Sequence, residues 1–210
     1  MSFSFDEVEF RRRAANALYS APPETARRSD DDLNPDARIV RPGIDPKPAA
    51  VLVPLVPRDG GLHVLLTLRT EHLSRHGGQV AFPGGRIDDT DENPVAAALR
   101  ETEEETGIDR GFVETIGFLD TYLTGTSYRV IPVVGILRHG FTVNPHAGEV
   151  ADVFEVPLSY LMNPKHHERH SREWQGMQRH YYAMPYQGRY IWGATAGMIR
   201  NLYSLVYETP

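Results

Sequence analysis

Three glutamates with helical spacing point most directly to a chemistry in this chain. Glu101, Glu104 and Glu105 are spaced i, i+3 and i+4, which places them on one face of the helix predicted over 93–106. Like charges at this spacing repel each other by about 0.2–0.5 kcal/mol per pair, and carboxylates near a helix C-terminus oppose its dipole. A divalent cation relieves both effects, and carboxylate oxygens favour Mg2+, Mn2+ or Ca2+ over zinc.

The alternative is a solvated acidic helix surface, and the glutamates alone leave both interpretations open. The segment before the helix favours the metal site. Phe82 and Pro83 close an apolar strand and are followed by Gly84 and Gly85, where the backbone can approach a ligand closely. Such a loop beside a metal-binding helix face suits a diphosphate held by metal ions and main-chain groups. Gly84 and Gly85 are therefore candidate substrate-binding residues.

The run from Gly85 to Ile108, GRIDDTDENPVAAALRETEEETGI, resembles the Nudix box. The usual box is a Gly, five residues, a Glu, seven residues and then REUxEExGU, where U is bulky and apolar. The second half, from Arg100 onward, matches at every fixed position, with a threonine at one U position. The first half is one residue longer than usual, and Asp91 stands where Glu is expected. Glu92 restores the spacing to Arg100, so the upstream acidic position stays open between Asp91 and Glu92.

The segment before the box, LLTLRTEHLSRHGGQVAFPGG from Leu65 to Gly85, is similar to the signature of Nudix CoA diphosphatases. This resemblance implies a Nudix fold, an α/β/α sandwich around a mixed β-sheet. It implies metal-dependent hydrolysis of coenzyme A or acyl-CoA to 4'-phosphopantetheine and adenosine 3',5'-bisphosphate. It also implies Mg2+ or Mn2+ held by Glu101, Glu104 and Glu105, with Arg100 orienting a glutamate through an ion pair.

Coenzyme A carries a 3'-phosphate, so an enzyme selective for it is expected to place cations near that group. Arg69, Arg75 and His76 lie in the distinguishing segment and are the candidate phosphate contacts, by position and chemistry. The alternative for Arg69 is an ion pair at the end of a surface strand, worth under about 1 kcal/mol.

Two other functions compete with CoA hydrolysis. One is Nudix hydrolysis of another nucleoside diphosphate derivative, such as ADP-ribose, or of a nucleoside triphosphate. The other is a domain that senses a ligand without turnover. The intact glutamates and the absence of an attached DNA-binding domain from the sequence count against the sensor.

Outside the box, Glu149 precedes an apolar strand and is a candidate general base, against the alternative of a solvated strand-end residue. His166 and His170 are spaced i, i+4 and would share a metal on a helix. The neighbouring Pro164 and polar residues favour an exposed loop instead. The sequence has neither the Gly-x-Ser-x-Gly nor the P-loop pattern, which argues against those two classes of enzyme.

The helix that carries the glutamates has clear end signals: Asn93 as N-cap, Pro94 in the first turn and Gly107 after the last turn. Further helices are expected at 4–18, after Pro157 and at 194–205. The irregular alternation of helices and strands, without a repeat, predicts a mixed sheet with helices packed on it. Strands are expected at 49–56, 62–69, 79–82, 112–122, 129–138, 149–156, 178–184 and 189–193.

The sequence predicts two parts of the chain: an N-terminal helix and extended arm, residues 1–48, and a hydrolase domain, residues 49–210. Ser4 and Glu7 have capping-box spacing, and Phe5, Val8 and Leu18 are the expected apolar stripe of the helix. Residues 20–40 are rich in Pro, Asp and Arg and are expected to bury little.

The composition limits the partners. A net charge of −6 argues against bulk electrostatic binding of nucleic acid. No apolar run approaches the ~20 residues that span a bilayer, so we expect no membrane partner and a cytoplasmic location. The chain has no cysteine, which excludes disulfides and thiolate metal sites. The N-terminal helix is a candidate contact in a homodimer.

Overall fold

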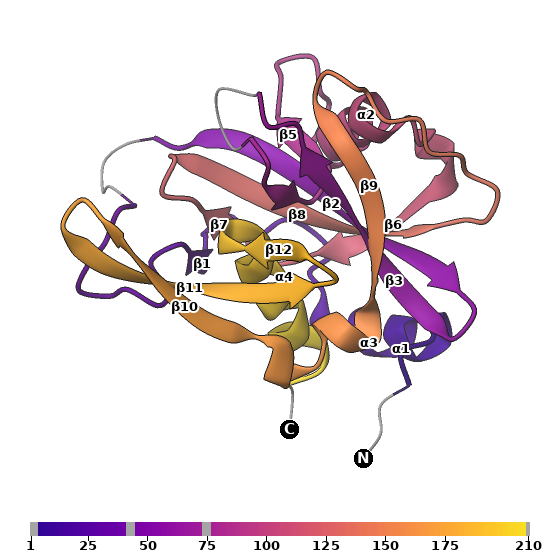
Figure 1. The fold of residues 1–210 in the computed structure, drawn as a ribbon. Helices are drawn as coiled ribbons and strands as arrows, with labels where there is room; N and C mark the ends of the chain where they lie inside the picture. Colours follow the sequence, from indigo (N-terminus) through magenta and orange to yellow (C-terminus); the bar gives the residue numbers. More distant parts are fainter. Residues whose placement is uncertain (1–3, 41–44, 73–76, 209–210) are drawn as a thin grey trace.

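The computed structural model describes residues 4–40, 45–72 and 77–208 and contains two β-sheets with packed helices (Figure 1). Within the described residues the main sheet has nine strands, of which six run in the order β1-β7-β8-β2-β3-β4. Its strands are β1 (Arg28–Ser29), β2 (Lys47–Arg58), β3 (Gly61–Arg69), β4 (Val80–Ala81), β5 (Gly84–Arg86), β6 (Val113–Phe118), β7 (Tyr122–Leu123), β8 (Tyr128–Leu137) and β9 (Val150–Pro157).

The second sheet is small and antiparallel, and consists of β10 (Glu168–Trp174), β11 (Met177–Tyr186) and β12 (Arg189–Trp192). The helices are α1 (Glu7–Ala17), α2 (Pro94–Thr106), α3 (Leu158–Leu161) and α4 (Gly193–Val206), with short 3-10 turns at Arg110–Phe112 and Pro164–His166. None of the helices in the described residues is long and apolar enough to cross a membrane.

The layers confirm the expected α/β/α arrangement around a mixed sheet. Helix α2 packs on one face of the main sheet, where Ala97 and Ala98 meet Leu52 and Val133. Helix α4 and the small sheet cover the other face and share the larger core (Figure 1). The β1–β7 and β2–β8 pairs are parallel and the other main-sheet pairs are antiparallel, so the sheet is mixed.

The end signals of the glutamate helix are confirmed. The Asn93 side chain accepts a hydrogen bond from the Ala96 N–H, and Pro94 begins α2. Gly107 ends α2 in the left-handed region, at φ 71°. A Cβ at Gly107 would lie 2.7 Å from the Asn144 carbonyl oxygen. The sequence therefore places the start and end of the element that carries the proposed metal ligands.

Two expectations about strands are wrong. The segment around His170, expected as a loop, forms β10, whose residues pair with β11 from Glu168 to Trp174. Its side chains are mostly exposed and polar, so it lacks the apolar alternation that signals a strand. The strand expected at 112–122 is instead two strands, β6 and β7, separated by residues 119–121. The pairing of β6 with β8 also shifts register between Thr115 and Gly117.

The N-terminal helix begins later than predicted, and a different face of it packs on the core. Asp6 is the N-cap, and its side chain accepts from the Glu9 N–H, so the predicted Ser4–Glu7 capping box is wrong. Val8 is 80% exposed, and Phe10 is fully buried in the main core. The apolar stripe predicted through Val8 is therefore also wrong, because the packed face of α1 runs through Phe10 and Ala14.

Residues 20–40 bury little, as expected, and their buried side chains are Asp31 and Asn34. Asp31 is buried against Arg179 of β11, with Oδ1 2.8 Å from Nη2. The Asn34 side chain donates to the His180 carbonyl oxygen and accepts from the His180 N–H. Hydrogen bonds that composition does not reveal thus fix the arm on the small sheet.

Candidate active site

Glu105 is the buried centre of the glutamate cluster, with 3% of its surface exposed. Arg69 Nη1 lies 3.1 Å from Glu105 Oε1, and the Gly84 N–H donates to Glu105 Oε2 at 3.1 Å. Burial raises the pKa of Glu105 to about 7, against the lowering effects of the Gly84 N–H and of Arg69. The negative charges of Glu101 and Glu149 raise it further.

Local strand geometry brings Arg69 and Gly84 to this carboxylate. The β3–β9 pairing shifts register between Leu68 and Arg69, as in a β-bulge, which redirects a side chain at a strand end. The Arg69 N–H donates to the Gln79 carbonyl, and the Arg69 carbonyl accepts from the Gly78 N–H. Gly84 is held by pairing of β5 with β2. Residues near both ends of the segment Leu65–Gly85, Arg69 and Gly84, therefore meet at Glu105.

Glu101 is half-buried beside Gly85, and burial raises its pKa. A Cβ at Gly85 would lie 2.5 Å from the Glu101 carboxyl carbon, so the glycine leaves room for this carboxylate. Arg100 Nη1 lies 2.9 Å from Glu101 and 3.2 Å from the more exposed Glu104. One guanidinium thus bridges two of the predicted metal ligands.

The contacts of Arg100 distinguish Asp91 from Glu92, the two candidates for the upstream acidic position of the box. Its Nε and Nη2 donate to the two carboxylate oxygens of Asp91, at 3.0 and 2.8 Å. This ion pair lowers the pKa of Asp91 to about 2. Glu92 is exposed, and Glu103 turns away from the cluster to pair with Arg110 at 2.6 Å. Asp91 is therefore the upstream acid that fixes Arg100.

The glutamate donors fit a hard divalent cation, since all of them are carboxylate oxygens and two are partly or fully withdrawn from water. Among the residues that the structure describes, no group of three His, Asp or Glu side chains is already gathered as a metal centre. Arginines occupy the carboxylates instead, Arg69 on Glu105 and Arg100 on Glu101 and Glu104. A cation bound here would compete with these two guanidiniums for the same oxygens.

The other predicted site residues are distributed around this cluster. Glu149 is exposed just before β9, and its carbonyl accepts from the Thr70 N–H. Arg75 and His76 lie outside the described residues. His166 and His170 are on separate elements: His166 Nδ1 is 2.9 Å from the Tyr160 carbonyl, and His170 contacts Glu168 and Tyr190. The two histidines therefore share no helix, as the shared metal would have required.

The two loop glycines are expected to respond differently to alanine. Gly84 has φ 148°, and its Cβ would lie 2.4 Å from the Ala50 carbonyl oxygen, so Gly84→Ala should lower the free energy of unfolding by about 2–4 kcal/mol. Gly85 meets only the end of the Glu101 side chain. Gly85→Ala should therefore keep stability within about 1 kcal/mol and lower kcat/KM by about ten- to hundredfold, through displacement of Glu101.

Urea unfolding and steady-state kinetics on both variants test this pair. Full activity in Gly85→Ala would exclude the contact between Gly85 and Glu101 from the working site. Equal loss of stability in the two variants would contradict the distinction between them.

Known proteins resemble this chain in sequence. The model of the NUDIX domain matches residues 46–175. The chain is 40% identical over 187 residues to a protein of Shigella flexneri named uncharacterized Nudix hydrolase NudL, covering 86% of this chain and 96% of that protein. It is 40% identical over 172 residues to Nudix hydrolase 15, mitochondrial, of Arabidopsis thaliana, covering 79% of this chain and 60% of that protein.

A solved structure shows the same fold. The Nudix hydrolase RenU of M. smegmatis superposes with a TM-score of 0.52 at 20% identity, over 78% of this chain and 88% of that one.

Proposed function

Since this chain belongs to the Nudix hydrolase family, we propose that it hydrolyses the diphosphate bond of coenzyme A or an acyl-CoA, with Mg2+ or Mn2+ as cofactor. The observation that supports this most is the convergence on Glu105. Arg69 and Gly84 contact its two carboxylate oxygens, and both come from the CoA-diphosphatase-like segment Leu65–Gly85. The segment that suggests the substrate is thus part of the candidate catalytic centre.

In this proposal Glu101, Glu104 and Glu105 hold the metal. A divalent cation bound by these carboxylates would polarise the diphosphate oxygens and lower the pKa of a water that it binds. Arg100, fixed by Asp91, orients Glu101 and Glu104 through its bridging hydrogen bonds. The protein thereby keeps the ligands in place at little entropic cost when the substrate binds.

The main chain of the glycine loop also orients ligands. The Gly84 N–H donates to Glu105, and Gly85 leaves the space that the Glu101 carboxylate fills. Glu149 is our candidate general base: it is exposed, and its negative charge adds, after burial and Glu101, to the raised pKa of Glu105. There it would accept a proton from the attacking water.

A substrate panel tests selectivity. We expect kcat/KM for CoA to exceed that for dephospho-CoA by roughly ten- to hundredfold, because a charge-assisted contact to the 3'-phosphate contributes on that order. ADP-ribose and ATP should be poorer substrates than CoA under the same Mg2+ concentration. A higher kcat/KM for ADP-ribose or ATP would assign the enzyme to the alternative nucleoside substrates. Tight binding of CoA without turnover would favour a ligand sensor.

A further inference from the structure

A hollow lies outside the glutamate cluster, between the N-terminal arm and the turn that joins β7 to β8. Its volume is about 630 Å³. Arginines Arg27, Arg28 and Arg38 line it from the arm, and Thr124 and Ser127 line it from the turn. In Figure 1 this region lies around β1 and β7, beside the β10–β11 hairpin.

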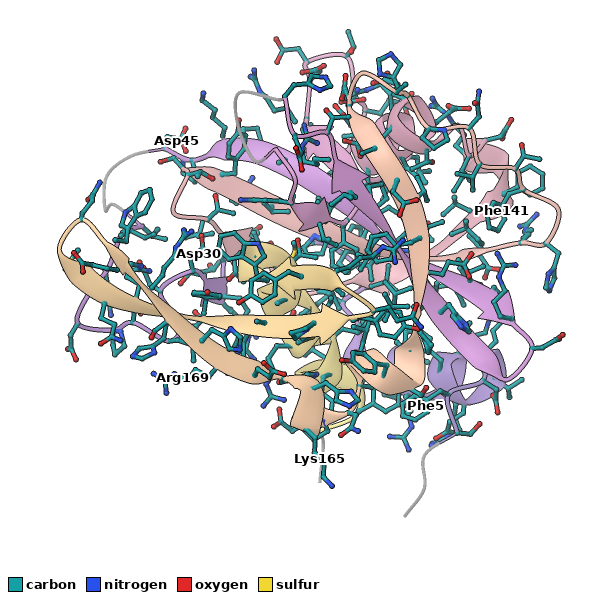
Figure 2. The ribbon with its side chains drawn as sticks, viewed as in Figure 1. Phe5, Asp30, Asp45, Phe141, Lys165 and Arg169 are labelled. Atoms are coloured by element: carbon teal, nitrogen blue, oxygen red, sulfur yellow. The ribbon has the colours of Figure 1, made fainter. Side chains whose placement is uncertain are left out.

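The walls of the hollow are fixed by the buried part of the arm. Asp30, labelled in Figure 2, accepts hydrogen bonds from the Gly125 N–H at 2.7 Å and from the Tyr122 hydroxyl at 3.0 Å. Asp31 Oδ1 and Oδ2 accept from the N–H groups of Ile39 and Val40, the two residues that follow Arg38. The hollow is therefore built by specific contacts.

The three guanidiniums have few partners. Arg38 Nε donates to the Pro35 carbonyl, and Arg27 Nη1 donates to the Tyr19 hydroxyl. Within residues 4–40, 45–72 and 77–208, neither Arg27 nor Arg38 has an ion pair with a carboxylate. The carboxylates nearest to Arg28 are Asp120 and Asp32, at 3.8 and 3.9 Å.

Two acids also line the hollow, and both have partners in the protein, which for Asp32 include Arg28. Asp31 is paired with Arg179 and with backbone N–H groups of the arm. Asp32 accepts from the N–H and hydroxyl of Ser29. Three arginines against two aspartates give the lining a formal charge of +1, although the whole chain has a net charge of −6. A local positive hollow in an acidic protein indicates an anionic ligand.

The sheet connects this hollow to the glycine loop. Gly85 pairs with Ala50 across β5 and β2, and three residues earlier on β2 the Lys47 N–H donates to the carbonyl of Ser127, which lines the hollow. At ~3.3 Å per strand residue, Ala50 and Lys47 are roughly 10 Å apart. Lys47 and Arg86, both exposed, lie along this ladder. This ladder runs from the glycine loop beside Glu101 toward the turn that lines the hollow.

We infer that this arginine-lined hollow binds a second phosphate of the substrate, remote from the diphosphate that is cut. The identity of that group rests on the proposed function, and for CoA it is the 3'-phosphate. Guanidinium groups form paired, charge-assisted hydrogen bonds with phosphate oxygens, which suits Arg28 and Arg38. Arg69, whose Nη1 contacts Glu105, then acts at the reacting end of the substrate.

Kinetics with CoA and dephospho-CoA on Arg38→Gln and Arg28→Gln test this inference. Each variant should lower kcat/KM for CoA by roughly ten- to hundredfold and change the value for dephospho-CoA less than about threefold, because that substrate lacks the 3'-phosphate. Arg138→Gln is the matched control, since Arg138 is an exposed arginine beyond the opposite end of β8. Its CoA preference should equal that of the wild type.

A binding titration separates failure of this inference from failure of the proposed function. Adenosine 3',5'-bisphosphate should bind the wild type more tightly than AMP does, and Arg38→Gln should abolish that difference, whether or not CoA is hydrolysed. The inference is overturned if both variants retain the CoA preference, if both substrates lose activity equally, or if the bisphosphate binds no better than AMP. Absence of CoA hydrolysis with the binding difference intact would overturn the proposed function alone.

Discussion

Replacing Glu105 with Gln is expected to lower kcat/KM by at least about a hundredfold, because metal activation of water is central to such hydrolysis. The substitution keeps the shape of the side chain and its contact with the Gly84 N–H. It removes the charge that a cation needs from the most buried carboxylate of the cluster. Kinetics at saturating Mg2+ measure the loss.

Glu103→Gln is the matched control for this variant. Glu103 lies on the same helix, two residues before Glu105, and pairs with Arg110 away from the cluster. We expect its activity to stay within about threefold of the wild type, because surface ion pairs contribute little. Near wild-type activity in Glu105→Gln, or an equal loss in both variants, would contradict the role of Glu105.

Glu105→Gln is also expected to change the pH dependence of stability. Burial raises the pKa of Glu105 to about 7, so the metal-free fold favours the neutral acid. The neutral Glu105 side chain makes its full contribution to the free energy of unfolding below the pKa of the unfolded state, about 4.5. That contribution is lost as pH rises through the folded-state pKa of about 7. The metal-free wild type should therefore lose up to about 3 kcal/mol of unfolding free energy relative to Glu105→Gln between pH 4.5 and 8. Urea unfolding of both proteins in EDTA measures it.

Phe10→Ala is expected to reduce the free energy of unfolding by about 3–5 kcal/mol, the usual cost of removing a buried aromatic ring. Phe10 is fully buried in the core that α4 shares with the main sheet. Val8→Ala is the control, because Val8 is 80% exposed on the same helix, and it should cost less than about 0.5 kcal/mol. Similar stabilities of the two variants in urea unfolding would show that α1 is not part of the folded core.

This result bears on the arm as a whole. A deletion of residues 1–35 would remove Phe10 and Ala14 from the core and Asp31 and Asn34 from the small sheet. Phe5, labelled in Figure 2, also packs against Tyr207, with the rings tilted by 37° and their centroids 5.3 Å apart. Composition alone predicts that such a truncation folds. The structure predicts instead that it is strongly destabilised.

The sequence predicts the site best where local signals determine the backbone. Asn93, Pro94 and Gly107 specify the ends of α2 through capping and a left-handed turn, so the glutamates could be placed on one helix face without coordinates. Gly84 and Gly85 similarly mark where the backbone must approach another group closely. These signals need only neighbouring residues, which is why the prediction holds there.

The features that the sequence could not predict depend on contacts between distant residues. Arg69 and Glu105 are 36 positions apart and meet because of the irregular pairing at the end of β3. Asp31 lies in a polar segment of the sequence, and its buried ion pair with Arg179 joins residues 148 positions apart. Strand β10 is polar and exposed, so its pairing with β11 leaves no apolar period.

The most direct test of the proposed function is one incubation of the purified wild type with CoA and Mg2+, followed by mass analysis of the products. The proposal predicts equal amounts of 4'-phosphopantetheine and adenosine 3',5'-bisphosphate, with no product when EDTA replaces Mg2+. CoA that stays intact, while ADP-ribose or a nucleoside triphosphate is hydrolysed under the same conditions, would contradict it.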